Sequence, residues 1–261
     1  MDSFQFHQLT REEISLLAKA GYAAVVPLAA TEQHGPHLGV GTDSLIGGHI
    51  AREAVRKATE TGRARLVLAP IVSIGCSGHH LAFGGTLSFS ADTYLRMLHD
   101  IGESLVRDGF RRIFFLNSHG GNANMMNQAA SDLVVRHPIR VAAASYWNAA
   151  SPFMKDVLAA NRGMVAGHAG RFETSAVMAL DEAMVRKNRV PREHEELPWL
   201  FAGPPGAFYG VHGKLTGNDG FTDASAESSA EQGREQLAAI VDGVAEWFAS
   251  VYAAMSEEAA P

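Results

Sequence analysis

The sequence predicts an α/β fold, in the form of a single-domain three-layer α/β/α sandwich with a mostly parallel central sheet. Short apolar runs alternate along the chain with segments whose apolar residues recur every three or four positions, the patterns of buried strands and amphipathic helices. Strands that alternate with helices are connected by crossovers over both faces of a parallel sheet. The chain has no internal repeat and no low-complexity linker, so one domain is expected over residues 1–261.

The first half of the chain supplies two strands and two helices. A helix is predicted over Arg11–Lys19, with Thr10 as its N-cap. The run Tyr22–Leu28 is short, uninterrupted and rich in β-branched and aliphatic residues, which indicates a buried strand. A helix from about Asp43 to Lys57 has its apolar residues on one stripe, and a second strand is predicted over Leu66–Val72.

The second half repeats this alternation. Ser90 is the predicted N-cap of a helix, and strands are predicted over Ile113–Leu116 and Arg140–Ser145, with a helix between them. Residues 191–224 are rich in Gly and Pro and poorly periodic, so we expect a loop or lid there. The C-terminal helix is predicted from an apolar stripe that consists of Leu237, Ile240, Val241, Val244, Phe248 and Val251.

Composition narrows the class of function. The hydrophobic fraction of 46% and the charged fraction of 19% are those of an ordinary soluble globular protein. A net charge of -6 without a long basic run argues against nucleic-acid binding. The single cysteine, Cys76, excludes an internal disulfide framework and suits a reducing cytoplasm. The N-terminus is polar and no apolar run approaches the ~20 residues that span a bilayer, so we expect a cytoplasmic protein without a membrane partner.

Reactive side chains gather where the predicted strands end. The loops 31–43, 75–80, 117–122 and 146–148 each follow a strand, and 167–173 opens a helix that starts near Glu173. Ligands of α/β proteins collect beyond the carboxyl ends of the strands. A histidine in one such loop is more often a structural or surface residue. Histidines and carboxylates in most of these loops predict one shared site.

The first of these loops has the residue types of a metal site. Glu32 and His34 are two positions apart, so in an extended segment their side chains point the same way, and Asp43 can add a third ligand. Carboxylates and imidazoles are good ligands for Zn, Mn and Fe. The alternative is a polar loop in which Asp43 only caps a helix.

Three segments resemble the creatininase (creatinine amidohydrolase) family: Thr31–His37 (TEQHGPH), Asn117–Asn122 (NSHGGN) and Gly167–Ser175 (GHAGRFETS). They stand in the order and at about the spacing of that family, and the resemblance covers roughly residues 20–185. Its members include creatininase, formamide deformylases and the mycofactocin precursor peptidase. The resemblance implies hydrolysis of a C–N amide bond by a hydroxide that bridges two metal ions. A cyclic amide, a formamide and a small peptide-like substrate all remain open.

The resemblance also implies a set of ligands for two divalent ions per subunit, with Zn preferred over Mn or Fe. Glu32 and His119 resemble ligands of one ion, His34 resembles a ligand of the other, and Asp43 resembles the bridging carboxylate. Creatininase itself has a glutamate ligand two residues after the histidine that matches His119. Gly121 stands there in this chain, so the fifth ligand is expected to be Glu173, as in the branch with the same His-Gly-Gly-Asn segment.

Other residues are expected to act on the substrate. His168 lies in a Gly-rich turn and would carry a proton to the leaving nitrogen; the alternative is that it only orients Glu173. Gly121 permits a close backbone approach, and Asn122 opens a helix whose N–H groups can hold an oxyanion. Trp147 can stack on a flat substrate. The resemblance places substrate contacts at Ser77, His79 and His80, although many relatives have Glu at the position of His79.

Competing interpretations are weaker. A serine hydrolase needs G-x-S-x-G, and Gly75–His79 fails at its last position. Cys76 has no dedicated base beside it that would make it a nucleophile. A catalytically silent relative, in which the metals only hold loops for an assembly, stays open. The resemblance implies a homo-oligomer, commonly a hexamer, that acts on a small-molecule amide.

Overall fold

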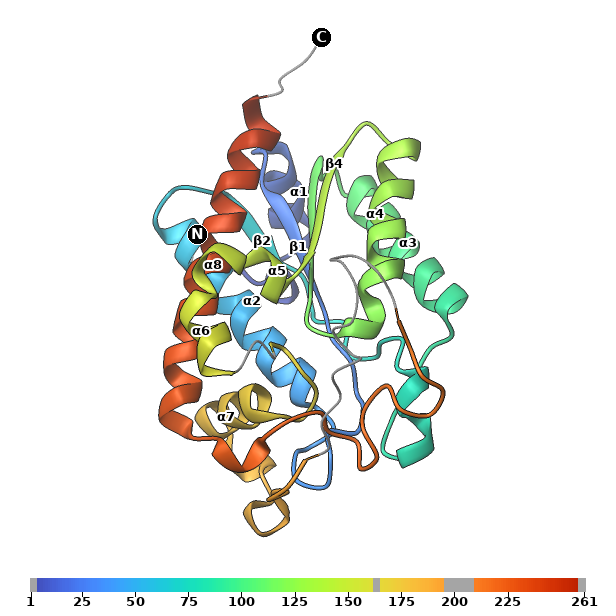
Figure 1. Cartoon of the computed structure of the whole chain (residues 1–261). Coiled ribbons are helices and arrows are strands. Elements are labelled where there is room, and N and C mark those ends of the chain that lie inside the picture. Colours follow the sequence, from blue (N-terminus) through green and yellow to red (C-terminus); the bar gives the residue numbers. More distant parts are fainter. Residues whose placement is uncertain (1–3, 162–164, 195–208, 258–261) are drawn as a thin grey trace.

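Four parallel strands form the central sheet, in the order β2-β1-β3-β4 (Figure 1). The structure is a computed structural model and describes residues 4–161, 165–194 and 209–257. The strands are β1 (Ala23–Leu28), β2 (Leu66–Leu68), β3 (Arg112–Asn117) and β4 (Arg140–Ser145). The central pair has Val26 opposite Phe115, and each described strand runs parallel to its neighbours.

Helices cover both faces of this sheet and make the three predicted layers. One face packs against α1 (Arg11–Lys19), α3 (Ala91–Arg107) and α4 (Ala123–Arg136). The other packs against α2 (Thr42–Glu60), α7 (Arg171–Leu180) and α8 (Ala230–Glu257). Side chains of β1 alternate between the two cores, because successive residues of a strand point to opposite faces. The fold class predicted from the sequence is confirmed.

Helix starts agree with the sequence and some strand ends do not. Thr10 and Ser90 cap α1 and α3 with their side chains, as predicted. The predicted strand over 66–72 is regular only to Leu68, because the pairing with β1 then shifts register: the Ala69 N–H bonds the Val25 carbonyl, and the Val72 N–H, three residues on, bonds the Pro27 carbonyl. Two short helices after β4, α5 (Tyr146–Ala149) and α6 (Lys155–Ala160), were not predicted. In the predicted loop over 191–224, residues 195–208 lie outside the described part, and the rest contains no helix or strand.

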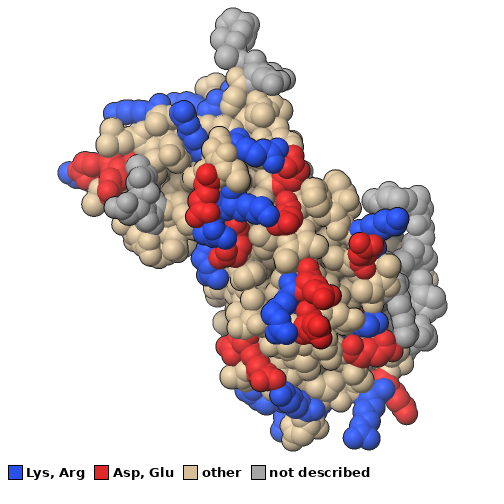
Figure 2. Space-filling view, turned by 90° about the vertical axis from the view of Figure 1, so that its left-hand side faces the viewer, with Lys and Arg blue, Asp and Glu red and all other residues tan. Residues whose placement is uncertain are grey.

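The long helix α8 is apolar because it is a core helix. By length and a mean hydropathy of 1.3 over its most apolar window, the segment Ala230–Ser256 would be long and apolar enough to cross a membrane. Its residues Ile240, Val244 and Phe248 are fully buried, in the core shared with α2 and α7. The opposite side of the helix is polar, and Lys57 and Arg63 pair with its Asp242 and Glu246. On the face viewed in Figure 2, acidic and basic side chains are interspersed rather than gathered in one basic patch.

The order of the strands creates a crevice at the sheet edge. The chain leaves β1 towards α2 on one face of the sheet, and it leaves β3 towards α4 on the other. The two neighbouring connections therefore diverge beyond the carboxyl ends of β1 and β3. Such a switch point is where open α/β sheets bind ligands.

Candidate active site

Five buried residues from four parts of the chain meet at this crevice, and we call them the cage. They come from the loop after β1, the first turn of α2, the loop after β3 and the first turn of α7. Each is at most 4% exposed. The members of the cage are Glu32, His34, Asp43, His119 and Glu173.

Asp43 lies at the centre of the cage. Its Oδ1 is 3.2 Å from His34 Nε2, and its Oδ2 is 3.3 Å from His119 Nδ1. Glu32 Oε1 lies 3.1 Å from His119 Nδ1, and Glu173 Oε2 lies 3.7 Å from His34 Nε2. The Asp43 side chain makes no helix-capping hydrogen bond, so the capping alternative does not account for it. Asp43 Oδ1 therefore faces the His34 side of the cage, and Oδ2 faces the His119 side.

Backbone carbonyls determine which imidazole nitrogens face inwards. His34 Nδ1 is 3.1 Å from the carbonyl oxygen of Glu32, and His119 Nε2 is 3.2 Å from that of Cys76. A carbonyl only accepts, so these nitrogens carry the hydrogens and the opposite nitrogens carry lone pairs. When the rings are neutral these lone pairs face carboxylate oxygens, an arrangement that is repulsive unless a metal ion or a bound proton lies between them.

The buried donor atoms fit divalent metal ions. Glu32 Oε2, His34 Nε2 and Asp43 Oδ2 are buried and have no hydrogen-bond partner within the described residues. Burial lowers the pKa of His34, but the carboxylates of Glu173 and Asp43 raise it to about 10. Burial raises the pKa of Glu173 to about 8. The cage therefore attracts positive charge, and its mixed oxygen and nitrogen donors suit Zn or Mn.

Removing the metal is expected to make stability depend on pH. In the metal-free fold Glu173 has a pKa of about 8 against an ordinary 4.5, and His34 has a pKa of about 10 against 6.5. Both raised values mean that the fold holds protons that the unfolded chain releases, so stability falls as pH rises from about 4.5 to 10. We expect the melting temperature of chelator-treated protein to fall by roughly 5–10 °C between pH 6 and 8.5. Metal-loaded protein, measured alongside by calorimetry, should fall by less; equal slopes would contradict this assignment.

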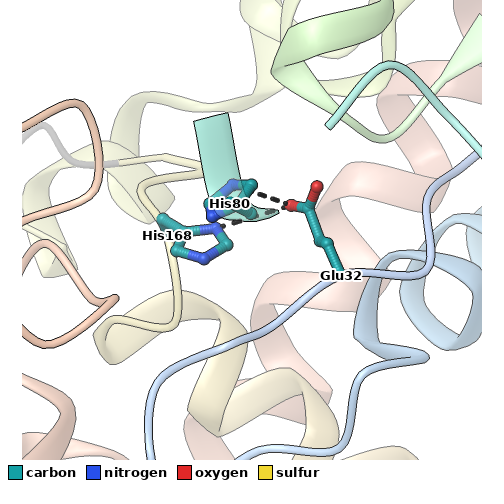
Figure 3. A group of neighbouring side chains, drawn as sticks. All are labelled: Glu32, His80 and His168. Atoms are coloured by element: carbon teal, nitrogen blue, oxygen red, sulfur yellow. Dashed lines mark ion pairs between the residues drawn. The ribbon is translucent and has the colours of Figure 1, made fainter. Parts of the chain in front are cut away.

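Two further histidines flank Glu32. His80 Nε2 is 3.3 Å and His168 Nδ1 is 3.7 Å from Glu32 Oε1. Figure 3 shows the two rings side by side, with both ion-pair lines ending on the same carboxylate oxygen. Burial, together with the charge of His34, lowers the pKa of His168 well below its ordinary value, so the ring is neutral. Glu173 is oriented by the Ala169 N–H, which donates to its Oε2 at 2.5 Å.

A cavity of about 480 Å³ opens onto the cage. Of the residues predicted to contact substrate, His79, His80, Gly121 and Trp147 line it. Burial lowers the pKa of His79 to about 4, so this ring adds no charge. The wall includes residues that the sequence did not single out, namely Asn124, Val165, Leu215, Thr216 and Thr222.

Two of the predicted contacts do not line the cavity. Ser77 is fully buried, with its Oγ 3.2 Å from His119 Nε2. The side-chain amide of Asn122 is also fully buried: its oxygen accepts from the Cys76 N–H, and its nitrogen donates to the Ala29 carbonyl. These residues hold the loops of the site together, a role that spacing in the sequence could not distinguish from contact with substrate.

Close packing sets the positions of the loops. A Cβ at Gly121 would lie 2.2 Å from the Cys76 carbonyl oxygen and 2.5 Å from His119 Nε2, so no side chain fits there. At the start of α7, Asp223 accepts a hydrogen bond of 2.7 Å from the Arg171 N–H, and a Cβ at Gly170 would overlap its carboxylate. The largely buried start of α7 is thus capped from 52 residues away, which fixes the turn that carries Glu173.

Comparison with known proteins gives matches over almost all of the chain. The family model described as creatininase, creatinine amidohydrolase, matches residues 7–248. The mycofactocin precursor peptide peptidase of Mycobacterium tuberculosis is 30% identical over 241 residues, which cover 89% of this chain and 88% of that protein. The creatinine amidohydrolase of Pseudomonas putida is 27% identical over 259 residues, covering 92% and 94%. A solved creatininase described with Mn has a TM-score of 0.77 at 25% identity, covering 96% of this chain and 99% of that one.

Proposed function

The chain belongs to the creatininase family, and we propose that it cleaves the C–N bond of a small amide at a centre of two divalent ions. Its relatives are amidohydrolases and peptidases, and it is a hydrolase of carbon–nitrogen bonds. The observation that carries the two-ion proposal is the Asp43 carboxylate, which presents one oxygen to His34 and the other to His119. With a single metal, the other pair would need a proton on its histidine in place of the second ion.

The cage divides into two ligand groups that share Asp43. Glu32 and His119 would complete one group, and His34 and Glu173 would complete the other, to which His168 also lies close. Two bound ions would lower the pKa of a shared water and polarise the attacked carbonyl. The three carboxylates would offset most of the positive charge of two divalent ions. The backbone carbonyls behind His34 and His119 keep both rings in the ligating tautomer. Zinc or manganese suits these donors, and the solved creatininase described with Mn supports manganese.

His168 would carry the proton to the leaving nitrogen. Its ring lines the cavity, and Nδ1 faces the cage while Nε2 bonds the Gln33 carbonyl. We expect His168→Ala to lower turnover by roughly 10²–10⁴-fold, which is the usual rate contribution of a positioned general acid or base. Its metal content should stay near that of the wild type. The exposed His7 supplies a control, because His7→Ala should change neither quantity. Loss of metal from the His168 variant would reassign this residue as a ligand.

The cavity favours an uncharged small molecule. Within residues 4–161, 165–194 and 209–257, no Lys or Arg side chain lines it. Trp147, Val165 and Leu215 supply an apolar wall, which suits a ring or another flat group beside the amide. The related proteins act on creatinine and on a peptide, so cyclic amides, formamides and short peptides are all proposed substrates. We also propose that the chain forms a homo-oligomer, a hexamer, as the family resemblance implies. Light scattering would measure the mass of this oligomer.

A panel of these amides tests the proposed function. We expect metal-loaded protein to cleave at least one class, chelated protein to cleave none, and added Zn or Mn to restore the activity. Two bound ions without any amide cleavage would instead favour the catalytically silent relative.

A serine mechanism is the alternative that the geometry brings into consideration, since Ser77, His119 and Asp43 follow one another at 3.2 and 3.3 Å. Ser77 is fully buried and outside the cavity wall. His119 Nε2 already bears the hydrogen that bonds the Cys76 carbonyl, so it cannot take the serine proton. Burial also raises the pKa of the Cys76 thiol, which opposes a thiolate nucleophile.

A further inference from the structure

Gln33 lies buried between the two histidines that flank Glu32. It is 7% exposed and follows Glu32 directly in the chain. Its side-chain Nε2 is 2.8 Å from His80 Nδ1, and its Oε1 is 2.9 Å from the Gly35 nitrogen. His168 Nε2 lies 2.9 Å from its backbone oxygen and 3.0 Å from its Nε2.

The Gly35 contact fixes the orientation of the Gln33 amide. A backbone N–H only donates, so the amide atom beside it is the oxygen and the other is the NH₂ group. That NH₂ group donates to His80 Nδ1, which must therefore carry a lone pair. His80 then carries its hydrogen on Nε2, which faces Glu32 Oε1 at 3.3 Å.

We propose that Gln33 is a positioning residue: its side-chain amide keeps the hydrogen of His80 on Nε2, so that His80 donates to Glu32 instead of joining the metal ligands. Glu32, His80 and His168 otherwise have the spacing of a third cation site. His80 could ligate only through Nε2, since Nδ1 faces Gln33, and the hydrogen on Nε2 prevents that. The Nε2–H instead holds Glu32 Oε1 in place beside His119.

Neighbouring packing leaves the Gln33 amide little freedom to rotate. A Cβ at Gly220 would lie 2.2 Å from Gln33 Oε1, so the loop before Thr222 closes over the amide. Thr222 in turn bonds both the N–H and the carbonyl of His168. Gln33 thus joins the loop after β1 to His80 and to the turn of His168. The consequence for Glu32 rests on its proposed role as a ligand, whereas the tautomer of His80 does not.

Nuclear magnetic resonance of histidine nitrogens tests the tautomer without any activity assay. In zinc-loaded protein labelled with ¹⁵N-histidine, we expect His80 to show a protonated Nε2 and an unprotonated, metal-free Nδ1. The signals are assigned by their loss in His80→Gln. In Gln33→Glu, which keeps the acceptor for Gly35 but cannot donate to His80, Nδ1 is expected to become protonated. A wild-type His80 protonated on Nδ1 alone, or bound to zinc, would overturn the proposal even if the variants fail to fold.

Metal binding tests the consequence for Glu32. We expect Gln33→Glu to weaken metal affinity or turnover by roughly 10–100-fold, the usual effect of losing a partner behind a ligand. His80→Gln retains an N–H donor and should keep affinity better than His80→Ala, with the number of ions at saturation unchanged in both. An ion lost from both would make His80 a ligand and overturn the proposal. Gln128→Glu, on the exposed face of α4, is the matched control and should leave metal affinity and turnover unchanged. A protein that binds no metal would refute the proposed function while leaving the His80 tautomer measurable.

Discussion

Replacing Asp43 by asparagine is expected to empty the whole cage of metal and to lower turnover by at least about a thousandfold. The bound metal ions would stabilise the transition state by several kcal/mol, and each loss of about 1.36 kcal/mol lowers the rate tenfold. Asp43 is the one cage residue whose two oxygens face both ligand groups. An asparagine would turn an NH₂ group towards one of the ions and remove a negative charge from both.

Metal content per chain, measured by mass spectrometry of the purified variant, checks this expectation beside turnover. Asp242→Asn is a suitable control, because Asp242 is half exposed on α8 and pairs only at the surface with Lys57. The control should bind as much metal as the wild type. Should Asp43→Asn retain two tightly bound ions, Asp43 would not be the shared carboxylate.

Replacing Glu173 by glutamine is expected to remove one ion and leave the other, with turnover lowered by on the order of 10²–10³-fold. Glu173 Oε2 lies 3.7 Å from His34 Nε2, whereas the group of Glu32, Asp43 and His119 does not depend on it. Glutamine can still accept the Ala169 N–H, so the local fold is preserved. Glu32→Gln should show the complementary loss, and the surface variant Glu182→Gln should show none. Two ions retained in Glu173→Gln would remove Glu173 from the ligand set.

A glutamate at position 121 is not expected to rescue the Glu173 variant. The family resemblance implies a glutamate ligand at the position of Gly121 in creatininase itself, but here a Cβ would collide with the Cys76 carbonyl and the His119 ring. The double variant Gly121→Glu with Glu173→Gln should therefore stay inactive and melt at a lower temperature. Recovery of activity would show that the loop can adopt the alternative arrangement.

Local signals in the sequence were sufficient for the fold, whereas the members of the cage were expected from the resemblance to the creatininase family. Thr10 and Ser90 predict where helices begin, because an N-cap side chain bonds a backbone N–H only a few residues away. Glu32, His34 and His119 lie in loops that follow strands, and a parallel sheet brings such loops to one edge, whereas Asp43 and Glu173 come from the first turns of α2 and α7. Their meeting follows from topology, while their service as metal ligands stays a prediction.

Features that depend on packing between distant segments could not be derived from the sequence. Asn122 was expected at an oxyanion and instead joins the Cys76 and Ala29 backbones, which no spacing reveals. Gln33 stands inside the quoted motif, yet alternation in an extended segment would turn it away from Glu32 and His34. Asp223 caps a helix whose own sequence offers only Gly170 at that position.

Anomalous diffraction from crystals of the wild-type protein, recorded at the zinc or manganese edge, tests the two-ion centre most directly. We expect two peaks about 3.5 Å apart, one contacted by Glu32 and His119, the other by His34 and Glu173, with Asp43 between them. The absence of metal from active protein, or a single peak that Asp43 does not contact, would contradict the account.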